Sequence, residues 1–312
     1  MEEFAVEMIR KLFLARILVI VLLQALPASN ASGAEPSPSS RSAKVPQRIV
    51  SLAPSMTEAL FALGAGDRLV GVTTFCDYPP QALQIPKIGN YVNPSIEAVL
   101  GRQPDLVVGV PEGTDYEKVK QMEALGLRVS VFPVSSVGAI FNSIRLLAQV
   151  VGREEAGAKL LRRMQSEMDS VRRHLGGSLR RRVLLVVGYR PLVAAGSKTF
   201  IGELLSLAGG ENITGAAQQS WPILSAETIV ARAPEVIIEA GMGSEREAQR
   251  LRWQDLSSLP AVKEGRIYSY PSDKILRPGP RIGEALEELA RLIHPECFAR
   301  ASSKREGGCE GP

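Results

Sequence analysis

EEAGAKLLRRMQSEMDSVRRHL occupies residues 154–175, near the middle of this 312-residue chain, and predicts one long helix. Its apolar residues recur three or four positions apart, and charged residues fill most of the positions between them. The apolar set is Leu161, Met164, Met168, Val171 and Leu175. At about 1.5 Å per residue the helix spans roughly 33 Å, the width of a small domain. The sequence therefore predicts a helix long enough to join two lobes.

The halves of the chain on either side of this helix contain related sequence. Residues 95–108, SIEAVLGRQPDLVV, align without a gap to residues 225–238, SAETIVARAPEVII. A weaker similarity pairs residues 60–67 with residues 204–211 in the same order. The stronger unit is typical of a short helix, a proline stop and a buried strand, as in a parallel sheet covered by helices. Two similarities in one order predict two α/β lobes of related design.

The start of the first lobe carries two local signals. Residues 48–53 form a short apolar strand, and Ser55 and Glu58 then have the spacing of a capping box, in which each side chain satisfies a backbone N–H group at a helix start. A second strand, residues 69–73, is followed by the loop FCDYPP at residues 75–80. Aromatic and polar side chains at a strand end predict a ligand site, because α/β folds place their sites there.

The composition divides the chain into six segments. Residues 1–34 predict a cleaved signal peptide, because basic residues accompany a short apolar run and small residues follow it. No Cys follows that run, so we expect no lipid anchor. Residues 35–47 are a flexible lead-in rich in Pro and Ser. We expect an N-terminal lobe at residues 48–153, the interlobe helix at 154–175, a C-terminal lobe at 176–298 and a disordered tail at 299–312.

Charge and cysteine content restrict the function further. The formal net charge is +4, and arginines cluster on and after the long helix. Aromatic residues are sparse and no nucleic-acid motif accompanies the cluster, so we interpret it as a solvated helix face and expect no nucleic-acid partner. The chain has three Cys, of which Cys297 and Cys309 can pair in an oxidising compartment, leaving Cys76 alone. Sequence does not decide whether that bond forms.

Several motifs, taken in order, resemble the periplasmic cobalamin-binding proteins of ABC importers, part of a wider family that binds iron siderophores, haem and cobalamin. The resemblance covers roughly residues 48–293. Its motifs are RIVSLAPS at residues 48–55 with Thr57-Glu58, DYPP at 77–80, the Glu97 and Glu227 helices with Pro104-Asp105 and Pro234-Glu235 after them, and RPGPR at 277–281. The resemblance implies two Rossmann-like α/β lobes joined by a single long rigid helix, the helical-backbone periplasmic binding protein fold. A continuous helix resists bending, so closure should be modest.

The resemblance also implies a function. It is that of a periplasmic substrate-binding component of an ABC importer, which captures cobalamin or a related corrinoid between its lobes and delivers it to the inner-membrane permease. The partners are then the permease and ATPase complex and a small-molecule ligand. We expect a monomer in the periplasm with no resident cofactor, because cobalamin is the transported ligand.

Two matched carboxylates, Glu97 and Glu227, occupy equivalent places in the two halves. In the cobalamin-binding family the acidic residues at these positions dock onto arginines of the permease, one per lobe. Such a pair suits a partner with two-fold symmetry. The alternative explanation is that Glu favours the positive end of a helix, where it contributes about 0.3 to 1 kcal/mol.

Four residues match ligand-contacting positions of the family: Tyr78, Tyr91, Trp221 and Asp273. A corrin ring is a large amphipathic disc, so flat aromatic side chains can cover its faces while polar groups meet its amide arms. Two family aromatics are replaced here by Val110-Pro111 and Leu192-Val193, which leaves the ligand open. A haem ligand would use Tyr78 on iron, and a ferric siderophore would use Arg190 and Arg277. Cys76 is either a cobalt ligand or, as we expect, a buried thiol.

Other classes of protein fit less well. A zinc or manganese receptor needs several converging His and carboxylates, and the chain has only His174 and His294. We expect no metal site, no catalytic residues and no enzyme, because the Gly-x-Ser-x-Gly elbow and the P-loop are missing. GMGSER at residues 241–246 lacks the third Gly of a dinucleotide site and is typical of a loop that begins a helix. A secreted ligand sensor of the same fold stays open as an alternative.

Overall fold

The computed structural model describes residues 44–113, 115–215, 217–241, 253–270 and 272–299. The residues from Val45 onward form one compact unit. The predicted signal peptide, most of the lead-in and nearly all of the tail lie outside the described residues. Within them, no helix is long and apolar enough to cross a membrane.

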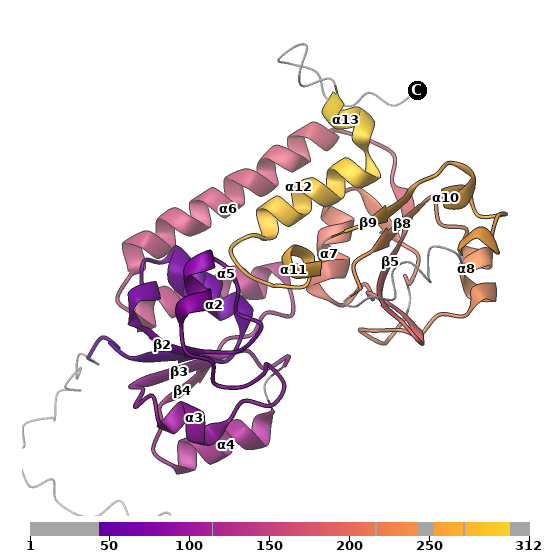
Figure 1. Ribbon diagram of the computed structural model, residues 1–312. Helices are drawn as coiled ribbons and strands as arrows, with labels where there is room; N and C mark the ends of the chain where they lie inside the picture. The colour runs from indigo at the N-terminus through magenta and orange to yellow at the C-terminus, as the bar shows by residue number, and fades with distance from the viewer. Residues whose placement is uncertain (1–43, 114, 216, 242–252, 271, 300–312) are drawn as a thin grey trace, which may run out of the picture. The chain divides into compact units, whose positions relative to one another are not determined.

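The N-terminal lobe is a four-stranded parallel sheet with helices on both faces. Its strands have the order β2-β1-β3-β4, and the four are β1 (Ile49–Ser51), β2 (Leu69–Val72), β3 (Leu106–Gly109) and β4 (Val129–Val131). One face carries α2 (Pro54–Ala62) and α5 (Val137–Val150), and the other carries α3 (Ile96–Leu100) and α4 (Tyr116–Ala124) (Figure 1). Two short 3-10 helices, η1 (Gly66–Arg68) and η2 (Pro80–Gln84), flank β2. Successive side chains of a strand point to opposite faces, so Ile49 packs with the α2 and α5 side and Val50 with the α3 and α4 side.

The C-terminal lobe repeats this plan and adds one strand. Its strands are β5 (Arg181–Tyr189), β6 (Leu192–Ala194), β7 (Gly210–Asn212), β8 (Val236–Glu239) and β9 (Ile267–Ser269). Strand β5 pairs in parallel with β7 and β8, β8 pairs in parallel with β9, and β6 folds back antiparallel on the end of β5. The lobe's helices are α7 (Phe200–Leu207), α8 (Ala226–Arg232), α10 (Pro260–Lys263), α11 (Ser272–Ile275), α12 (Ile282–Ile293) and α13 (Pro295–Ala299).

The two sheets confirm the internal repeat. The parallel strands run β2-β1-β3-β4 in one lobe and β7-β5-β8-β9 in the other, so the order is the same. The repeat helices α3 and α8 precede the equivalent strands β3 and β8, and a serine caps each of them. Ser95 Oγ accepts the backbone N–H of Ala98, and Ser225 Oγ accepts that of Thr228. Each repeat therefore builds the same helix start, stop and strand.

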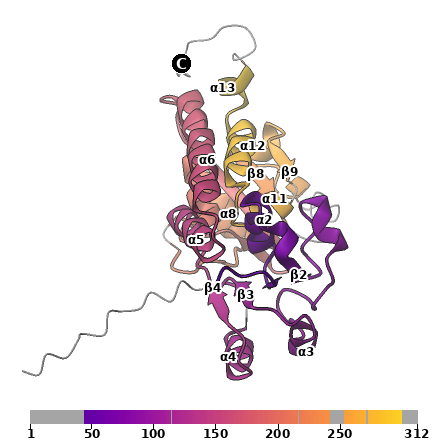
Figure 2. The same cartoon turned by 90° about the vertical axis from the view of Figure 1, so that its left-hand side faces the viewer.

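The long helix α6 (Glu154–Leu175) begins and ends where the sequence predicts. Its buried stripe includes Leu160, whereas Leu161 is only partly buried, so the first residue of the predicted stripe was displaced by one position. Helix α6 runs beside α12, as Figures 1 and 2 show from two directions. The contact is close at Gly283, where a Cβ atom would come within 2.3 Å of Glu167 Oε2. Helix α6 is therefore supported along part of its length by α12, and α5 also packs against it.

One apolar core extends through both lobes. Strand residues such as Leu106 and Val236, the α6 residues Met164 and Met168, and α12 residues such as Leu286 belong to a single buried cluster. Apolar burial contributes about 25 cal/mol per Å² and is lost wherever packed surfaces separate. The core therefore resists separation of the two sheets from α6.

One sequence prediction about local structure was wrong, and two strands were not predicted. Strand β7 has the sequence Gly-Glu-Asn, without an apolar residue, and β6 is the three-residue segment Leu-Val-Ala. The capping box does not form, because Ala53 is the N-cap residue of α2, with no side-chain cap hydrogen bond, and Pro54 occupies the first helical turn. The Glu58 carboxylate turns away from the helix start and bonds to the other lobe.

Candidate functional site

Tyr78 and Asp273, predicted site residues from different lobes, meet on one side chain. Tyr78 follows β2, and its ring lies over the guanidinium of Arg281, 3.9 Å from carbon to ring centroid. Asp273 in α11 places Oδ2 3.6 Å from Nη1 of the same Arg281. Both Tyr78 and Asp273 are exposed on their outer sides. The structure thus brings together one aromatic and one acidic residue that the sequence places nearly 200 positions apart.

Glu58 is the buried partner of Arg281. Arg281 donates from Nε to Glu58 Oε2 at 2.8 Å and from Nη2 to Oε1 at 2.7 Å. Arg277 donates to Glu58 Oε1 at 3.3 Å and to both oxygens of Asp77, at 2.5 and 3.1 Å. We call Glu58, Asp77, Asp273, Arg277 and Arg281 the interlobe charge cluster. Paired planar guanidinium and carboxylate groups of this kind make strong, directional hydrogen bonds.

The cluster is layered by burial. The Glu58 side chain is 2% exposed, and those of Arg281 and Arg277 are 7% and 13% exposed. Asp273 and Asp77 lie outermost, at 45% and 53%. A buried charge needs partners, because its desolvation is expensive. The inner carboxylate therefore has two guanidinium partners, and the outer carboxylates cover those guanidinium groups.

The electrostatics follow from this layering. The hydrogen bond from Arg277 is the main reason that the pKa of Asp77 lies below its usual value. Burial is the largest single effect on Arg281 and acts to lower its pKa, but the hydrogen bonds to Glu58 and the negative charges of Glu58 and Asp273 together outweigh burial, so the pKa rises above its usual value. Both groups therefore stay charged at neutral pH, and the ion pairs persist there.

A cavity of about 430 Å³ adjoins the cluster. Glu58, Tyr78 and Arg281 form part of its wall. Arg163 of α6 and Glu284 of α12 also line it. The cavity therefore lies where the two lobes and both long helices meet.

Tyr91 and Trp221 lie apart from the cluster. The phenol of Tyr91 fits against the backbone at Gly113, where a Cβ atom would come within 1.8 Å of its hydroxyl oxygen. Burial, with a smaller effect of Glu112, raises the pKa of Tyr91 to about 12. Trp221 is 47% exposed, in a loop joined to β6 by a hydrogen bond from Ala194 N to Pro222 O. Neither aromatic residue lines the cavity beside the cluster.

Glu97 and Glu227 occupy equivalent, exposed positions in the first turns of α3 and α8. Each lies two residues after the serine that caps its helix, Ser95 or Ser225. A hydrogen bond with Ser225 is the main cause that lowers the pKa of Glu227. Both carboxylates are thus presented to solvent in matching helix starts, one in each lobe.

The remaining candidate ligands are occupied within the protein. Cys76 is buried, and Thr57 donates a hydrogen bond to its Sγ atom at 3.2 Å, so it is the buried thiol that we expected. His294 is buried beside the Gly209 carbonyl, and His174 stacks on Phe298. Cys297 is disulfide-bonded. Its predicted partner Cys309 lies outside the described residues, so that pairing stays a prediction.

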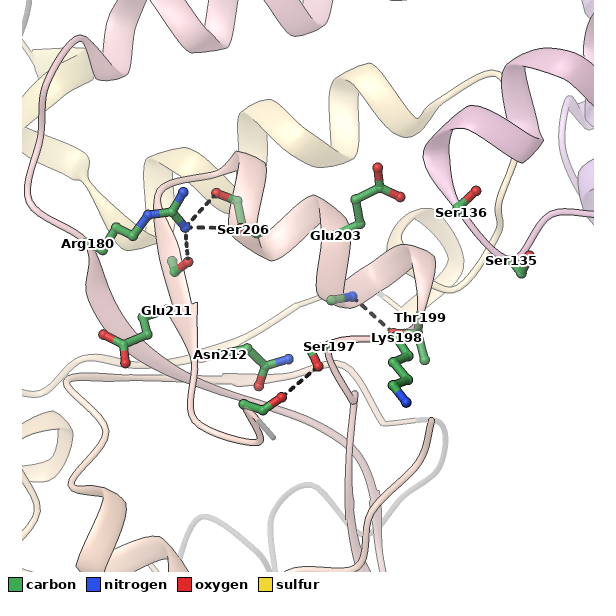
Figure 3. Close-up of a pocket in the computed structure, with 13 residues that line it drawn as sticks. Ser135, Ser136, Arg180, Ser197, Lys198, Thr199, Glu203, Ser206, Glu211 and Asn212 are labelled. Atoms are coloured by element: carbon green, nitrogen blue, oxygen red, sulfur yellow. Dashed lines mark hydrogen bonds between the residues drawn. The ribbon is translucent and has the colours of Figure 1, made fainter. Parts of the chain in front are cut away.

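A larger cavity, of about 550 Å³, lies beside α7 in the C-terminal lobe (Figure 3). Small polar residues form much of its wall, and several of them bond within the protein. Arg180 donates to the Ser206 hydroxyl and the Gly210 carbonyl, and Lys198 donates to Gln218. Glu203 accepts the backbone N–H of Val137 at the start of α5, which is a second polar link between the lobes. These groups hold loops and helix ends together.

Sequence reasoning missed the center of the site. It assigned Glu58 to a capping box and gave Arg281 and Asp77 no role beyond their motifs. Glu58 and Arg281 are 223 residues apart, so no local spacing joins them. The one available signal was the presence of two arginines, Arg277 and Arg281, around Pro-Gly-Pro, since rigid turns often carry site residues.

Two parallel-sheet lobes that share a core along one long helix, with side chains of both lobes converging on one cluster, define a two-lobed α/β binding protein. Residues 49–274 match the family model described as "Periplasmic binding protein". The match covers more than half of the chain, so the chain belongs to this family.

Several known proteins are similar to this one over most of its length. A vitamin B12-binding protein of Vibrio parahaemolyticus is 28% identical over 78% of this chain and 88% of that protein. An ABC transporter substrate-binding lipoprotein of Bacillus subtilis, YvrC, is 31% identical over 82% of each. The crystal structure of the vitamin B12-binding protein BtuF of Vibrio cholerae has a TM-score of 0.72 at 26% identity and covers 83% of this chain and 99% of that one. The haem-binding protein RhuT of Roseiflexus sp. RS-1 has a TM-score of 0.73 at 29% identity, covering 80% and 99%.

Proposed function

We propose that the protein is the periplasmic substrate-binding component of an ABC importer, and that it captures cobalamin or a related corrinoid between its lobes. The observation that carries this proposal is the convergence of Tyr78 from one lobe and Asp273 from the other on Arg281. A ligand held there contacts both lobes at once. The relatives named as vitamin B12-binding proteins support the corrinoid as the leading ligand.

The chemistry of the side chains suits such a ligand. The outer face of Tyr78 offers an aromatic surface, since Arg281 already covers its inner face. Exposed Trp221 and half-buried Tyr91 are further aromatic candidates from the two lobes. The Asp273 carboxylate accepts hydrogen bonds from amide arms. Binding and release then leave the ligand unchanged, and the protein acts by binding rather than by catalysis.

Delivery needs a partner, which we propose to be the permease and ATPase complex of the importer. Glu97 and Glu227 are the docking residues, because one exposed carboxylate per lobe matches a two-fold symmetric permease. We also propose that the protein is exported to the periplasm and that its signal peptide is cleaved. We propose that the mature protein has no lipid anchor. Because one relative is named as a lipoprotein, mass spectrometry of the mature protein should test this point.

Titration of the purified protein tests the ligand. Cyanocobalamin, dicyanocobinamide, haemin and a ferric siderophore are added separately, and tryptophan fluorescence is recorded. The chain has two tryptophans, and Trp253 is buried with its indole N–H bonded to Glu239, so the exposed Trp221 should report on the ligand. We expect saturable quenching by the two corrinoids that is strongly reduced in Trp221→Phe. Saturation by haemin alone favours haem, which the similarity to RhuT makes the second candidate.

A further inference from the structure

The interlobe charge cluster carries an excess of negative charge. It contains three carboxylates, Glu58, Asp77 and Asp273, against the two guanidinium groups of Arg277 and Arg281. The carboxylates also occupy the outer layer, because Asp77 and Asp273 are about half exposed while both arginines are buried behind them. An approaching ligand therefore meets carboxylate oxygens before it meets guanidinium nitrogens.

Both terminal nitrogens of Arg277 and all three guanidinium nitrogens of Arg281 already face partners within the protein. Arg277 uses Nη1 for Asp77 and Glu58, and Nη2 for Asp77 and the Phe75 carbonyl. Arg281 uses Nε and Nη2 for Glu58, and its remaining Nη1 faces Asp273. Its flat face is covered by the Tyr78 ring. An anionic arm of a ligand must displace one of these carboxylates to reach a guanidinium group.

We propose that this cluster selects ring ligands whose arms are uncharged hydrogen-bond donors over ligands whose arms are carboxylates, and that Asp77 is the residue that sets this selectivity. Asp77 neutralises Arg277 and covers it from solvent. Carboxylate oxygens accept from amide N–H groups, whereas a second carboxylate placed against them is repelled. The inference rests on the proposed function, since it assumes that the ligand lies against Tyr78 and Asp273.

A pair of ligands that differ by one charge tests the proposal. Cyanocobalamin and its monocarboxylic derivatives, in which one side-chain amide is hydrolysed to a carboxylate, share the same ring. Dissociation constants are measured by calorimetry for each derivative at low and high salt. At low salt we expect at least one monocarboxylic derivative to have a dissociation constant roughly tenfold higher than that of cyanocobalamin. This ratio should become smaller at high salt. Equal affinities for the amide and every acid overturn the proposal.

Asp77→Asn identifies the residue responsible. The substitution removes one charge from an exposed side chain and leaves Glu58 as the charged partner of Arg277. The ratio of the dissociation constants of acid and amide should therefore fall toward one. Glu117→Gln, an exposed acid on α4, removes the same charge elsewhere and should keep the wild-type ratio. A wild-type ratio in Asp77→Asn overturns the role of Asp77, as does an equal fall in Glu117→Gln.

Failure of the proposed ligand gives a different result. If cyanocobalamin does not bind and haemin does, the corrinoid assignment fails while the charge selectivity is still testable. Haemin, which carries two propionates, is then compared with its dimethyl ester, which carries none. Tighter binding of the ester supports the selectivity, and tighter binding of the dianion overturns it.

Discussion

Arg281 donates hydrogen bonds to both carboxylate oxygens of Glu58, at 2.8 and 2.7 Å, although the two residues are 223 positions apart in the sequence. Arg281 belongs to the C-terminal lobe and Glu58 to the first helix of the N-terminal lobe. Both side chains are almost fully buried. The two lobes are therefore joined at the site by a buried ion pair as well as along α6.

Replacing Glu58 by Gln should destabilise the protein by roughly 3 kcal/mol, because it leaves two guanidinium groups buried with too little opposite charge. Chemical denaturation measures the free energy of unfolding. The matched control is Glu287→Gln, which breaks an exposed pair with Arg291 on α12 and should cost less than about 1 kcal/mol. Equal losses in the two variants would show that the buried pair contributes little.

Acid should weaken the contact between Asp77 and Arg277. The pKa of Asp77 is lower in the folded protein than its usual value of 3.8, so its stabilisation is complete above that value and is lost as the pH falls below it. The difference in melting temperature between wild type and Asp77→Asn should therefore be largest at about pH 6 and shrink as the pH falls below 3.8. A constant difference over this range would contradict the lowered pKa.

Gly283→Ala should destabilise the contact between α12 and α6 by about 2 kcal/mol, because the added Cβ atom overlaps Glu167. The distance to Glu167 Oε2 would be 2.3 Å. Thermal unfolding measures the change, and Glu167→Ala in the same chain should restore part of it. Gly138→Ala in α5 is the control, since nothing lies within 4 Å of its Cβ position. That control should be neutral or slightly stabilising, as alanine favours helix.

Reversing the charge of Glu97 and Glu227 together should abolish uptake of labelled cyanocobalamin by cells that depend on this protein. Both side chains are exposed at helix starts, so the ligand dissociation constant of the purified double variant should stay within about twofold of wild type. Each single reversal should give an intermediate rate, because each lobe contacts one permease subunit. Undiminished uptake by the double variant would remove the docking assignment.

Much of the fold could be predicted because its signals are local. The apolar period of residues 154–175 located α6, and the duplicated segments at 95–108 and 225–238 predicted two related lobes, which the shared strand order confirms. Ser95 and Ser225 cap helices because a hydroxyl needs only the backbone three residues ahead. Strands β6 and β7 were not predicted, because β7 is Gly-Glu-Asn, without an apolar residue, and β6 is a short strand defined by its antiparallel pairing with the end of β5.

The sequence alone determined the long helix, the repeat and the order of the elements, since each depends on neighbours within a few turns or on a direct copy. Only the tertiary structure decided what Glu58 does. Its spacing from Ser55 suits a capping box, but a buried carboxylate beside two buried guanidinium groups is stabilised more by pairing with them than by one backbone N–H. Folding brings Arg277 and Arg281 to it from more than 200 residues away, and that contact creates the site.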